Sequence, residues 1–247
     1  RLPYADFSTP ALRRHFCERE VALNGPRAPG LYLGVRAVAR GEDGRLRWDG
    51  PGEAVDWVVV MRRFAQEALL DRVAAAGGLS DGLVDALALR VAEAHAAAPV
   101  SVEAGAANVA AVLAVNEAGF ATSHVLPEGE VAAVEAAFRE GLARRAALLD
   151  ARGEGGRIRR CHGDLHLRNI CLWEGEPRLF DGIDFNDRLA TCDVLYDLAF
   201  LLMDLWHRGL RAQASRLVNR YLDRTGDDGG FALLPYLMAL RAAVRAH

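Results

Sequence analysis

Hydrophobic positions along the chain follow two different patterns. Before about residue 64 they occur in short runs rich in β-branched and aromatic residues, on either side of a turn-like stretch at 41–44. These runs predict strands at 31–35, 46–48 and 55–61. From Gln66 onward apolar residues recur every three or four positions, which predicts helices. The predicted helices span 66–76, 80–98, 106–118, 129–151, 194–208, 211–224 and 230–246. The pattern therefore predicts an α+β fold, with a small sheet followed by a largely helical region.

A further helix is predicted near the start of the chain. Ser8 can cap its first turn, and Pro10 suits a first-turn position. Glu20 then falls on the apolar face of this helix with Leu12, Phe16 and Leu23, whereas Glu18 lies on the opposite side. A buried carboxylate needs a cationic partner, which makes Glu20 a candidate site residue. The alternative is a shorter helix with Glu20 on its surface.

A largely polar segment at 163–169 lies between two predicted strands, at 158–162 and 170–173. A tight turn at 174–177 and a returning strand at 178–180 complete a hairpin. The hairpin would bring Asn169 close to Asp181 and Asp184. These side chains offer oxygen ligands of the kind that Mg²⁺ prefers. Together with Asp164 they suit phosphoryl transfer, which needs a positioned hydroxyl and neutralised phosphate charge.

Composition limits the alternatives. A chain of 247 residues, half of them apolar, suits one domain or two closely packed lobes. The formal charge of −3 argues against general nucleic-acid binding. There is no apolar run of membrane-spanning length and no signal-peptide pattern, so no membrane association is expected. The four cysteines lack paired metal-site spacing, which is typical of reduced thiols in the cytoplasm.

The segments His162-Gly163-Asp164 to Asn169, Ile183-Asp184-Phe185 and Asp197-Leu198-Ala199 resemble those of the aminoglycoside phosphotransferase-like kinases. That family has a protein-kinase-like fold and includes choline, homoserine and fructosamine kinases. The sequence at 185–187 and 199–205 looks closer to one uncharacterised bacterial branch of the family, in which the kinase domain is often joined to a P-loop ATPase domain. The resemblance implies a two-lobe fold. Residues 1–64 would form a truncated, β-rich N-terminal lobe with a hinge at 61–64, and residues 65–247 a helical catalytic lobe.

The resemblance also implies roles for individual residues. Asp164 would be the catalytic base, and Asn169 would hold Mg²⁺. Backbone amides near Met61 and Arg62 would meet the adenine of ATP, although an ordinary buried strand would look the same. Two residues are candidates for the second metal carboxylate. Asp184 lies in an Ile-Asp-Phe sequence like that of the family, whereas the distance of Asp181 from Asn169 along the chain better suits the usual hairpin length. We favour Asp184 and allow that both act.

Other residues would support the site. His162 would order the catalytic loop by hydrogen bonding. Asp197 would buttress that loop from a helix start, the alternative being a helix cap. His166 and Arg168 lie inside the loop and could face substrate or phosphate. His95, on the predicted helix at 80–98, is interpreted as an interhelical histidine and not as a ligand.

The chain contains no lysine; every Lys or Arg position is arginine. Kinases of this fold use a lysine to bridge the α and β phosphates of ATP, paired to a helical glutamate. Glu20 is our candidate for that glutamate. The lysine and the Gly-rich loop are expected upstream of Arg1.

The leading prediction is an ATP- and Mg²⁺-dependent phosphotransferase acting on a hydroxyl of a small molecule such as an amino sugar, sugar or amino alcohol. Carboxylates at Asp181, Asp187 and Asp193 would favour a cationic acceptor. The missing lysine motivates the alternative, a catalytically weak, kinase-like nucleotide-binding or regulatory module for a fused or associated P-loop ATPase.

Overall fold

The computed structural model describes residues 6–123 and 127–246. The chain packs as two compact units, Arg1–Leu79 with Leu167–Ala190 and Ser80–His166 with Thr191–His247. It therefore crosses from the second unit to the first after His166 and returns after Ala190. This division comes from packing, and the lobe boundary expected at residues 64–65 stays a prediction.

Helix α1 (Pro10–Asn24) opens the first unit. The predicted cap at Ser8 is wrong by one residue, since Thr9 Oγ1 accepts the Leu12 N–H at 3.2 Å. Ser8 instead donates its own N–H to Asp6 Oδ1 at 3.0 Å. Two adjacent hydroxyl residues are equally good caps by type, and the position of Pro10 as the first helical residue selects Thr9.

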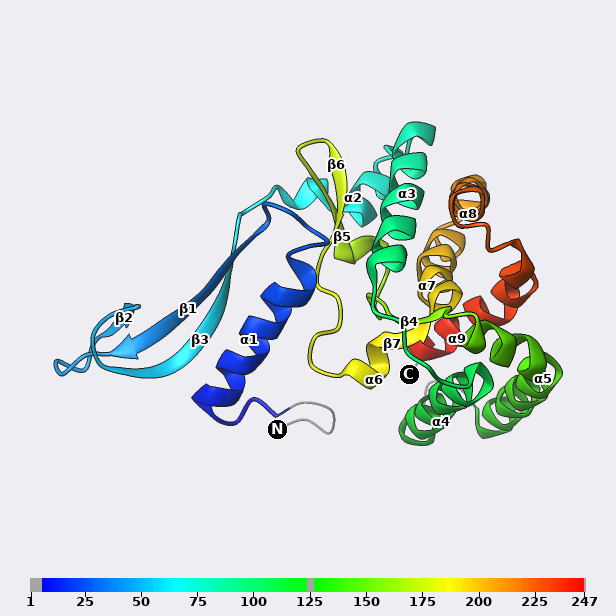
Figure 1. The fold of residues 1–247 in the computed structure, drawn as a ribbon, viewed down its shortest axis with the longest axis horizontal. Coiled ribbons are helices and arrows are strands. Elements are labelled where there is room, and N and C mark those ends of the chain that lie inside the picture. The colour runs from blue at the N-terminus through cyan, green and yellow to red at the C-terminus, as the bar shows by residue number, and fades with distance from the viewer. Residues whose placement is uncertain (1–5, 124–126, 247) are drawn as a thin grey trace. The chain divides into compact units, whose positions relative to one another are not determined.

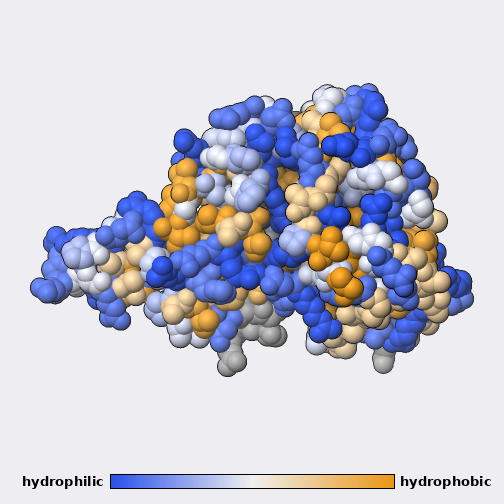
Figure 2. Space-filling view, in the orientation of Figure 1, coloured by the Kyte–Doolittle hydropathy of each residue, from blue (hydrophilic) through white to orange (hydrophobic). Residues whose placement is uncertain are grey.

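The three predicted strands form one antiparallel sheet in the order β2–β1–β3 (Figure 1). The strands are β1 (Tyr32–Arg40), β2 (Leu46–Trp48) and β3 (Glu53–Met61). Strand β1 is longer than predicted because Arg40 still pairs with Leu46 on one side and Glu53 on the other. Helix α1 packs against β1 and β3. The turns at the free end of the sheet are hydrophilic on the face that Figure 2 shows.

The helix predicted at 66–76 is interrupted. A 3₁₀ turn, η1 (Gln66–Ala68), precedes a short helix, α2 (Leu70–Ala75). Between them Leu69 is extended, with φ −64° and ψ 133°, and forms a β-bridge with Cys171. The tertiary contact therefore overrides a helical pattern.

The predicted hairpin is confirmed. A 3₁₀ turn, η2 (Leu167–Asn169), leads into β5 (Ile170–Trp173), which pairs antiparallel with β6 (Glu176–Leu179). Glu174 and Gly175 form the turn with φ values of 54° and 80°. The hairpin packs on a buried cluster around Ala28, Leu31 and Cys171. A short helix, α6 (Asp187–Ala190), ends the first unit.

The second unit is helical except for one small sheet. Its helices are α3 (Asp81–Ala97), α4 (Gly105–Thr122), α5 (Glu128–Glu154), α7 (Val194–His207), α8 (Arg211–Thr225), the 3₁₀ segment η3 (Asp228–Leu233) and α9 (Leu234–Ala246). Strands β4 (Ile158–Arg160) and β7 (Thr191–Asp193) pair antiparallel. Ser80 caps α3, as predicted, by accepting the Leu83 N–H. Among the described residues no helix combines the length and hydrophobicity that a membrane crossing requires.

A buried arginine fixes the start of α7. The Arg152 guanidinium donates to both oxygens of Asp193 at 2.7 and 2.8 Å and to both oxygens of Asp227 at 2.6 and 2.8 Å. Asp193 in turn caps α7 by accepting the Leu195 N–H at 2.8 Å. This network ties α5, β7 and η3 together, so that α7 is held at a defined position in the core of the second unit.

Candidate active site

The loop that carries Asp164, which we call the catalytic loop, follows β4 in the second unit. It is held in place by Asp197, which binds two of its backbone amides. Asp197 lies in the first turn of α7 and is 0% exposed. Its Oδ1 accepts the Gly163 N–H at 2.8 Å, and its Oδ2 accepts the His162 N–H at 3.2 Å. The cap of α7 is Asp193, so the carboxylate of Asp197 acts on the loop. Paired backbone amides hold the loop in one conformation.

The ionised form of Asp197 is strongly favoured. Burial by itself would raise the pKa of this carboxyl. The hydrogen bond and charge of His95, followed by the charges of His162 and Arg241, instead lower the pKa well below its ordinary value. The carboxylate is therefore present as an acceptor at any physiological pH.

Arg241 on α9 supports the same loop and was missed by sequence reasoning. Its Nη1 donates to the Gly163 carbonyl at 3.0 Å, and its Nε donates to the Tyr196 carbonyl at 3.1 Å. The guanidinium lies over the rings of Tyr196 and Phe200, at 3.8 and 4.7 Å from their centroids. Its Nη2 lies 3.7 Å from Asp197 Oδ1. Nothing in the sequence of the last helix distinguishes Arg241 from Arg245, because only the tertiary structure buries Arg241.

Asp164 itself is partly open to solvent. Its side chain is 40% exposed, and its backbone N–H donates to His162 Nδ1 at 3.3 Å. His166 Nε2 lies 3.4 Å from Asp164 Oδ2, and the His166 ring contacts Phe200 edge-on at 5.3 Å. A carboxylate on a fixed loop, reachable from solvent, is what a hydroxyl-activating base requires.

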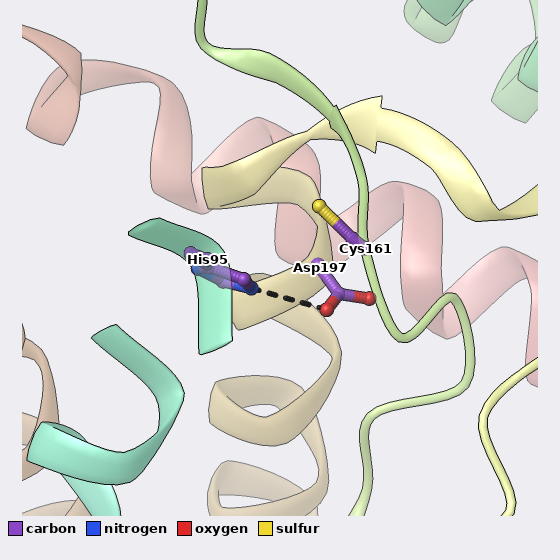
Figure 3. Close-up of side chains that lie close together, drawn as sticks. All are labelled: His95, Cys161 and Asp197. Atoms are coloured by element: carbon purple, nitrogen blue, oxygen red, sulfur yellow. Dashed lines mark hydrogen bonds and ion pairs between the residues drawn. The ribbon is translucent and has the colours of Figure 1, made fainter. Parts of the chain in front are cut away.

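Figure 3 shows His95, Cys161 and Asp197 close together behind this loop. Their potential ligand atoms lie within 4.8 Å of one another, and the residue types suit a metal. Each atom is, however, already hydrogen bonded. His95 Nε2 contacts Asp197 Oδ2 at 3.1 Å, His95 Nδ1 contacts the Tyr221 hydroxyl at 2.8 Å, and Cys161 Sγ donates to the Cys192 carbonyl at 3.6 Å. We interpret the group as a buttress, and the contacts confirm His95 as an interhelical histidine.

The remaining predicted ligands lie in the first unit. There Glu20 of α1 is close enough to Asp184 and Asp181 for their charges to act on it. Burial raises the pKa of Glu20 most, and the charges of Asp184 and then Asp181 raise it further, to about 7. Three carboxylates therefore lie near one another in the first unit, and both burial and the two neighbouring charges oppose ionisation of Glu20.

Three further side chains position the acidic segment, and sequence reasoning assigned none of them a role. Asn24 at the end of α1 is fully buried, accepts the Gly182 N–H at 2.9 Å and donates to the Gly182 carbonyl at 3.1 Å. The Tyr32 hydroxyl accepts the Asp181 N–H at 3.1 Å. Arg19 Nε donates to the Asp184 carbonyl at 2.8 Å. These contacts pin the backbone on both sides of Gly182. Asn24 and Arg19 lie on α1 and Tyr32 begins β1, and polar side chains at such positions are too common in a sequence to single these three out.

Asp181 and Asp184 differ in environment. Asp181 is exposed and has φ 59°, a left-handed conformation that aspartate tolerates better than most residues. Asp184 is partly buried. Asn169 is 6% exposed, and its carbonyl accepts the Phe180 N–H at 3.0 Å at the open end of the hairpin. An amide and several carboxylates form a donor set that fits Mg²⁺, and a cation here would relieve the repulsion on Glu20.

The predicted hinge residues lie at the end of β3. Met61 pairs with Tyr32 of β1 and packs on the cluster around Leu31. The Arg62 N–H is already used, because it donates to the Leu31 carbonyl at 2.8 Å. Contact between adenine and this segment stays a prediction.

Replacing Glu20 with glutamine should stabilise the metal-free protein at high pH. Because the folded pKa of about 7 lies above the ordinary value of 4.5, ionisation of Glu20 costs stability as the pH rises between these values. In EDTA at pH 8 we expect the free energy of unfolding of the variant to exceed that of wild type by about 1 kcal/mol. At pH 4 we expect the two proteins to be equally stable. Urea unfolding at both pH values measures this.

The matched control is Glu18→Gln on the exposed side of the same helix, where Glu18 pairs with Arg14. We expect this control to change stability by less than about 0.5 kcal/mol at either pH. Equal effects of Glu20→Gln at pH 4 and pH 8 would contradict the assigned repulsion.

Comparisons with known proteins identify a family model and curated relatives that match most of this chain. A family model described as "Phosphotransferase enzyme family" matches residues 35–234. An uncharacterised protein of Mycobacterium tuberculosis (strain H37Rv) is 30% identical over 249 residues, covering 98% of this chain and 48% of the relative. A Mycobacterium bovis protein, also uncharacterised, matches to the same extent. The chain thus spans about half the length of the curated relatives it matches.

Two solved structures have a similar fold. A glucosamine kinase aligns with a TM-score of 0.53 and 20% identity, over 96% of this chain and 65% of that one. An aminoglycoside phosphotransferase of Streptomyces rimosus aligns with a TM-score of 0.53 and 19% identity, over 98% of this chain and 83% of that one. At this identity the likeness concerns the fold, and it confirms the predicted α+β, kinase-like class.

Proposed function

Because the chain belongs to the phosphotransferase enzyme family, we propose that it moves the γ-phosphate of ATP to a hydroxyl of a small molecule with the help of Mg²⁺. The observation that supports this most directly is the loop around Asp164. Two backbone amides of the loop, those of His162 and Gly163, are bound to the buried carboxylate of Asp197, and Arg241 holds the Gly163 carbonyl that follows them. A loop fixed in this way positions a base before substrate arrives, which lowers the reorganisation that the reaction requires.

In this proposal Asp164 accepts or orients the proton of the acceptor hydroxyl, and His162 and Asp197 keep the loop in place. Asn169 and Asp184 hold Mg²⁺, with Asp181 as a secondary ligand. The metal, when bound, neutralises charge on the phosphate groups. Asp184 is the better main ligand because it is partly buried. A carboxylate that is shielded from water attracts a cation more strongly than an exposed one.

ATP binding in this proposal uses the backbone near Met61 and Arg62 and the carboxylate of Glu20. Residues 1–247 contain no lysine that could pair with Glu20. The pKa of Glu20, about 7 without a partner, supports this reading, because a neighbouring ammonium group would favour the ionised form.

The acceptor is proposed to be a small hydroxylated molecule: an amino sugar, a sugar or an amino alcohol. Two carboxylates that the sequence offered as support for a cationic acceptor are engaged in the fold. Asp193 is buried against Arg152, and Asp187 pairs with Arg19 at 2.7 Å. The positive charge of the acceptor therefore has less support than its hydroxyl group.

The experiment is an acceptor screen with the full-length protein, in which ADP release is measured with Mg²⁺-ATP over amino sugars, sugars and amino alcohols. We expect ADP release that depends on one class of acceptor and is lost in EDTA. With that acceptor, the Mg²⁺ concentration for half-maximal activity should rise in Asp184→Asn more than in Asp181→Asn. If ATP and Mg²⁺ bind but no acceptor increases ADP release, the transfer proposal fails.

That failure would favour the second candidate, a catalytically weak nucleotide-binding or regulatory module for an attached or associated P-loop ATPase. The absence of lysine is the specific observation behind it. The two candidates differ in one measurable way. A regulatory module would change the ATPase rate of its partner upon binding nucleotide, without forming a phosphorylated small molecule.

A further inference from the structure

A cavity of about 520 Å³ opens in the second unit between α3 and α8, beside β4 and the first residue of α7. None of the residues predicted for catalysis, metal binding or nucleotide binding lines it. Its volume lies within the range of roughly 300–1,000 Å³ that is usual for small-molecule sites. Its apolar walls come from Ala92, Ala96 and Val194. The cavity is therefore large enough for a metabolite and separate from the proposed active site residues.

The charges that line this cavity are predominantly positive. Arg157, Arg159 and Arg224 contribute to its wall, and Glu93 is the acidic residue among them. Glu93 is already paired with Arg90 at 2.9 Å. Within the described ranges, Arg224 forms no ion pair with any carboxylate.

The other two arginines are anchored without losing their charge. Arg157 lies 3.8 Å from Asp227, whose two oxygens are held more closely by Arg152. Arg159 donates to the carbonyls of His95 and Ala96 at 3.0 and 2.8 Å, where α3 ends. The Arg159 guanidinium, which these backbone contacts fix, loses little conformational entropy when it binds an anion.

The cavity is also connected to the catalytic loop through one buried side chain. His95 is 4% exposed, lines the cavity and contacts the Tyr221 hydroxyl, which lines it as well. The other ring nitrogen of His95 contacts Asp197, which binds the amides of His162 and Gly163. A ligand in the cavity would thus lie two hydrogen-bonded side chains away from the loop that carries the proposed base.

We propose that this cavity binds a small phosphate monoester and that the bound ligand stabilises the catalytic loop through His95 and Asp197. Arginine guanidinium groups recognise phosphate by paired, charge-assisted hydrogen bonds. The apolar wall accommodates the carbon part of such a ligand. Binding and loop stability are then coupled, so that each changes the other by the same factor. The binding part of this inference holds whether or not the chain proves to be a phosphotransferase.

The test is calorimetric titration of the full-length protein with glycerol 3-phosphate, in EDTA and without nucleotide, so that metal-dependent binding of phosphate at the nucleotide site is suppressed. Arg224→Gln removes a cavity arginine. Arg211→Gln is the matched control, because Arg211 lies on the same helix but stacks on Trp206 outside the cavity. We expect at least about a tenfold weaker affinity in Arg224→Gln and no change in Arg211→Gln.

Glycerol, which lacks the phosphate, should not bind. Arg157→Gln serves as a second cavity variant if Arg224→Gln does not fold as wild type does. The proposal is overturned if glycerol 3-phosphate does not bind to the wild-type protein, or if the cavity variants and Arg211→Gln bind it equally well.

Hydrogen exchange tests the coupling to the loop. Saturating glycerol 3-phosphate should slow hydrogen exchange of the His162 and Gly163 amides in the wild-type protein. In His95→Gln the same ligand should slow exchange of these amides less. Glutamine can still fill the space of the imidazole but cannot bridge Tyr221 and Asp197 in the same way. Unchanged exchange at these two amides with the ligand bound would overturn the coupling.

Discussion

Replacing Asp164 with asparagine is expected to lower the rate of phosphate transfer by about 100- to 10,000-fold, the usual contribution of a general base. Asparagine preserves the shape of the side chain but cannot accept a proton. Because the Asp164 side chain is 40% exposed, the substitution should change the free energy of unfolding by less than about 0.5 kcal/mol. The measurement is ADP release with saturating acceptor and Mg²⁺-ATP, together with urea unfolding of both proteins.

The control for Asp164→Asn is Asp223→Asn, which neutralises a carboxylate that is 70% exposed on α8. We expect the control to keep full activity. Acceptor-dependent ADP release at the wild-type rate in Asp164→Asn would show that another group activates the hydroxyl, and His166, at 3.4 Å from the same carboxylate, would then be the first candidate.

Asp197→Asn should cause the largest loss of stability, about 3–5 kcal/mol, because it leaves a buried charge network without its anion. Each oxygen of Asp197 accepts a loop amide, at 2.8 Å for Gly163 and 3.2 Å for His162. An asparagine side chain has one oxygen, so one loop amide would face an NH₂ group and stay unsatisfied. Arg241 would lose its nearby negative charge as well. Urea unfolding measures the loss, and exchange of the two loop amides should accelerate.

The effect of Asp197→Asn also has a defined pH dependence. The folded pKa of Asp197 is depressed, so its carboxylate contributes stability fully above the unfolded pKa of about 4. That contribution is lost as the pH falls toward the folded pKa. The difference in stability between wild type and Asp197→Asn should therefore be constant from pH 5 to 8 and shrink below about pH 4.

Asp85→Asn provides the comparison for this variant. Asp85 binds Arg216 at 2.7 Å in a solvent-screened pair, so its replacement should destabilise the protein far less than Asp197→Asn does. If Asp197→Asn were no more destabilised than Asp85→Asn, and its loop amides exchanged at the wild-type rate, Asp197 would not buttress the loop.

Several elements could be predicted because their signals are local. The run of β-branched and aromatic residues at 55–61 and the turn residues Glu174 and Gly175 depend on neighbours a few positions apart, and the strands and the hairpin follow from them. The cap of α3 at Ser80 is equally local. The break at Leu69 is not, because its extended backbone is fixed by a bridge to Cys171, about a hundred residues later. No helical pattern contains that information.

The candidate site divides in the same way. The sequence by itself determined which chemistry is offered. Asp164, Asn169, Asp181 and Asp184 stand at spacings that suit phosphate transfer, and the family model matches the segment that contains them. Only the tertiary structure decided what holds these groups. It brought Arg241 to the Gly163 carbonyl of the catalytic loop, His95 to the carboxylate of Asp197 and Asn24 to the backbone of Gly182. Buried polar groups must be satisfied by whatever side chain packing places beside them. The type of a residue determines which functional group it offers. Its hydrogen-bond partner depends on tertiary contacts between residues far apart in the sequence, which no local pattern specifies.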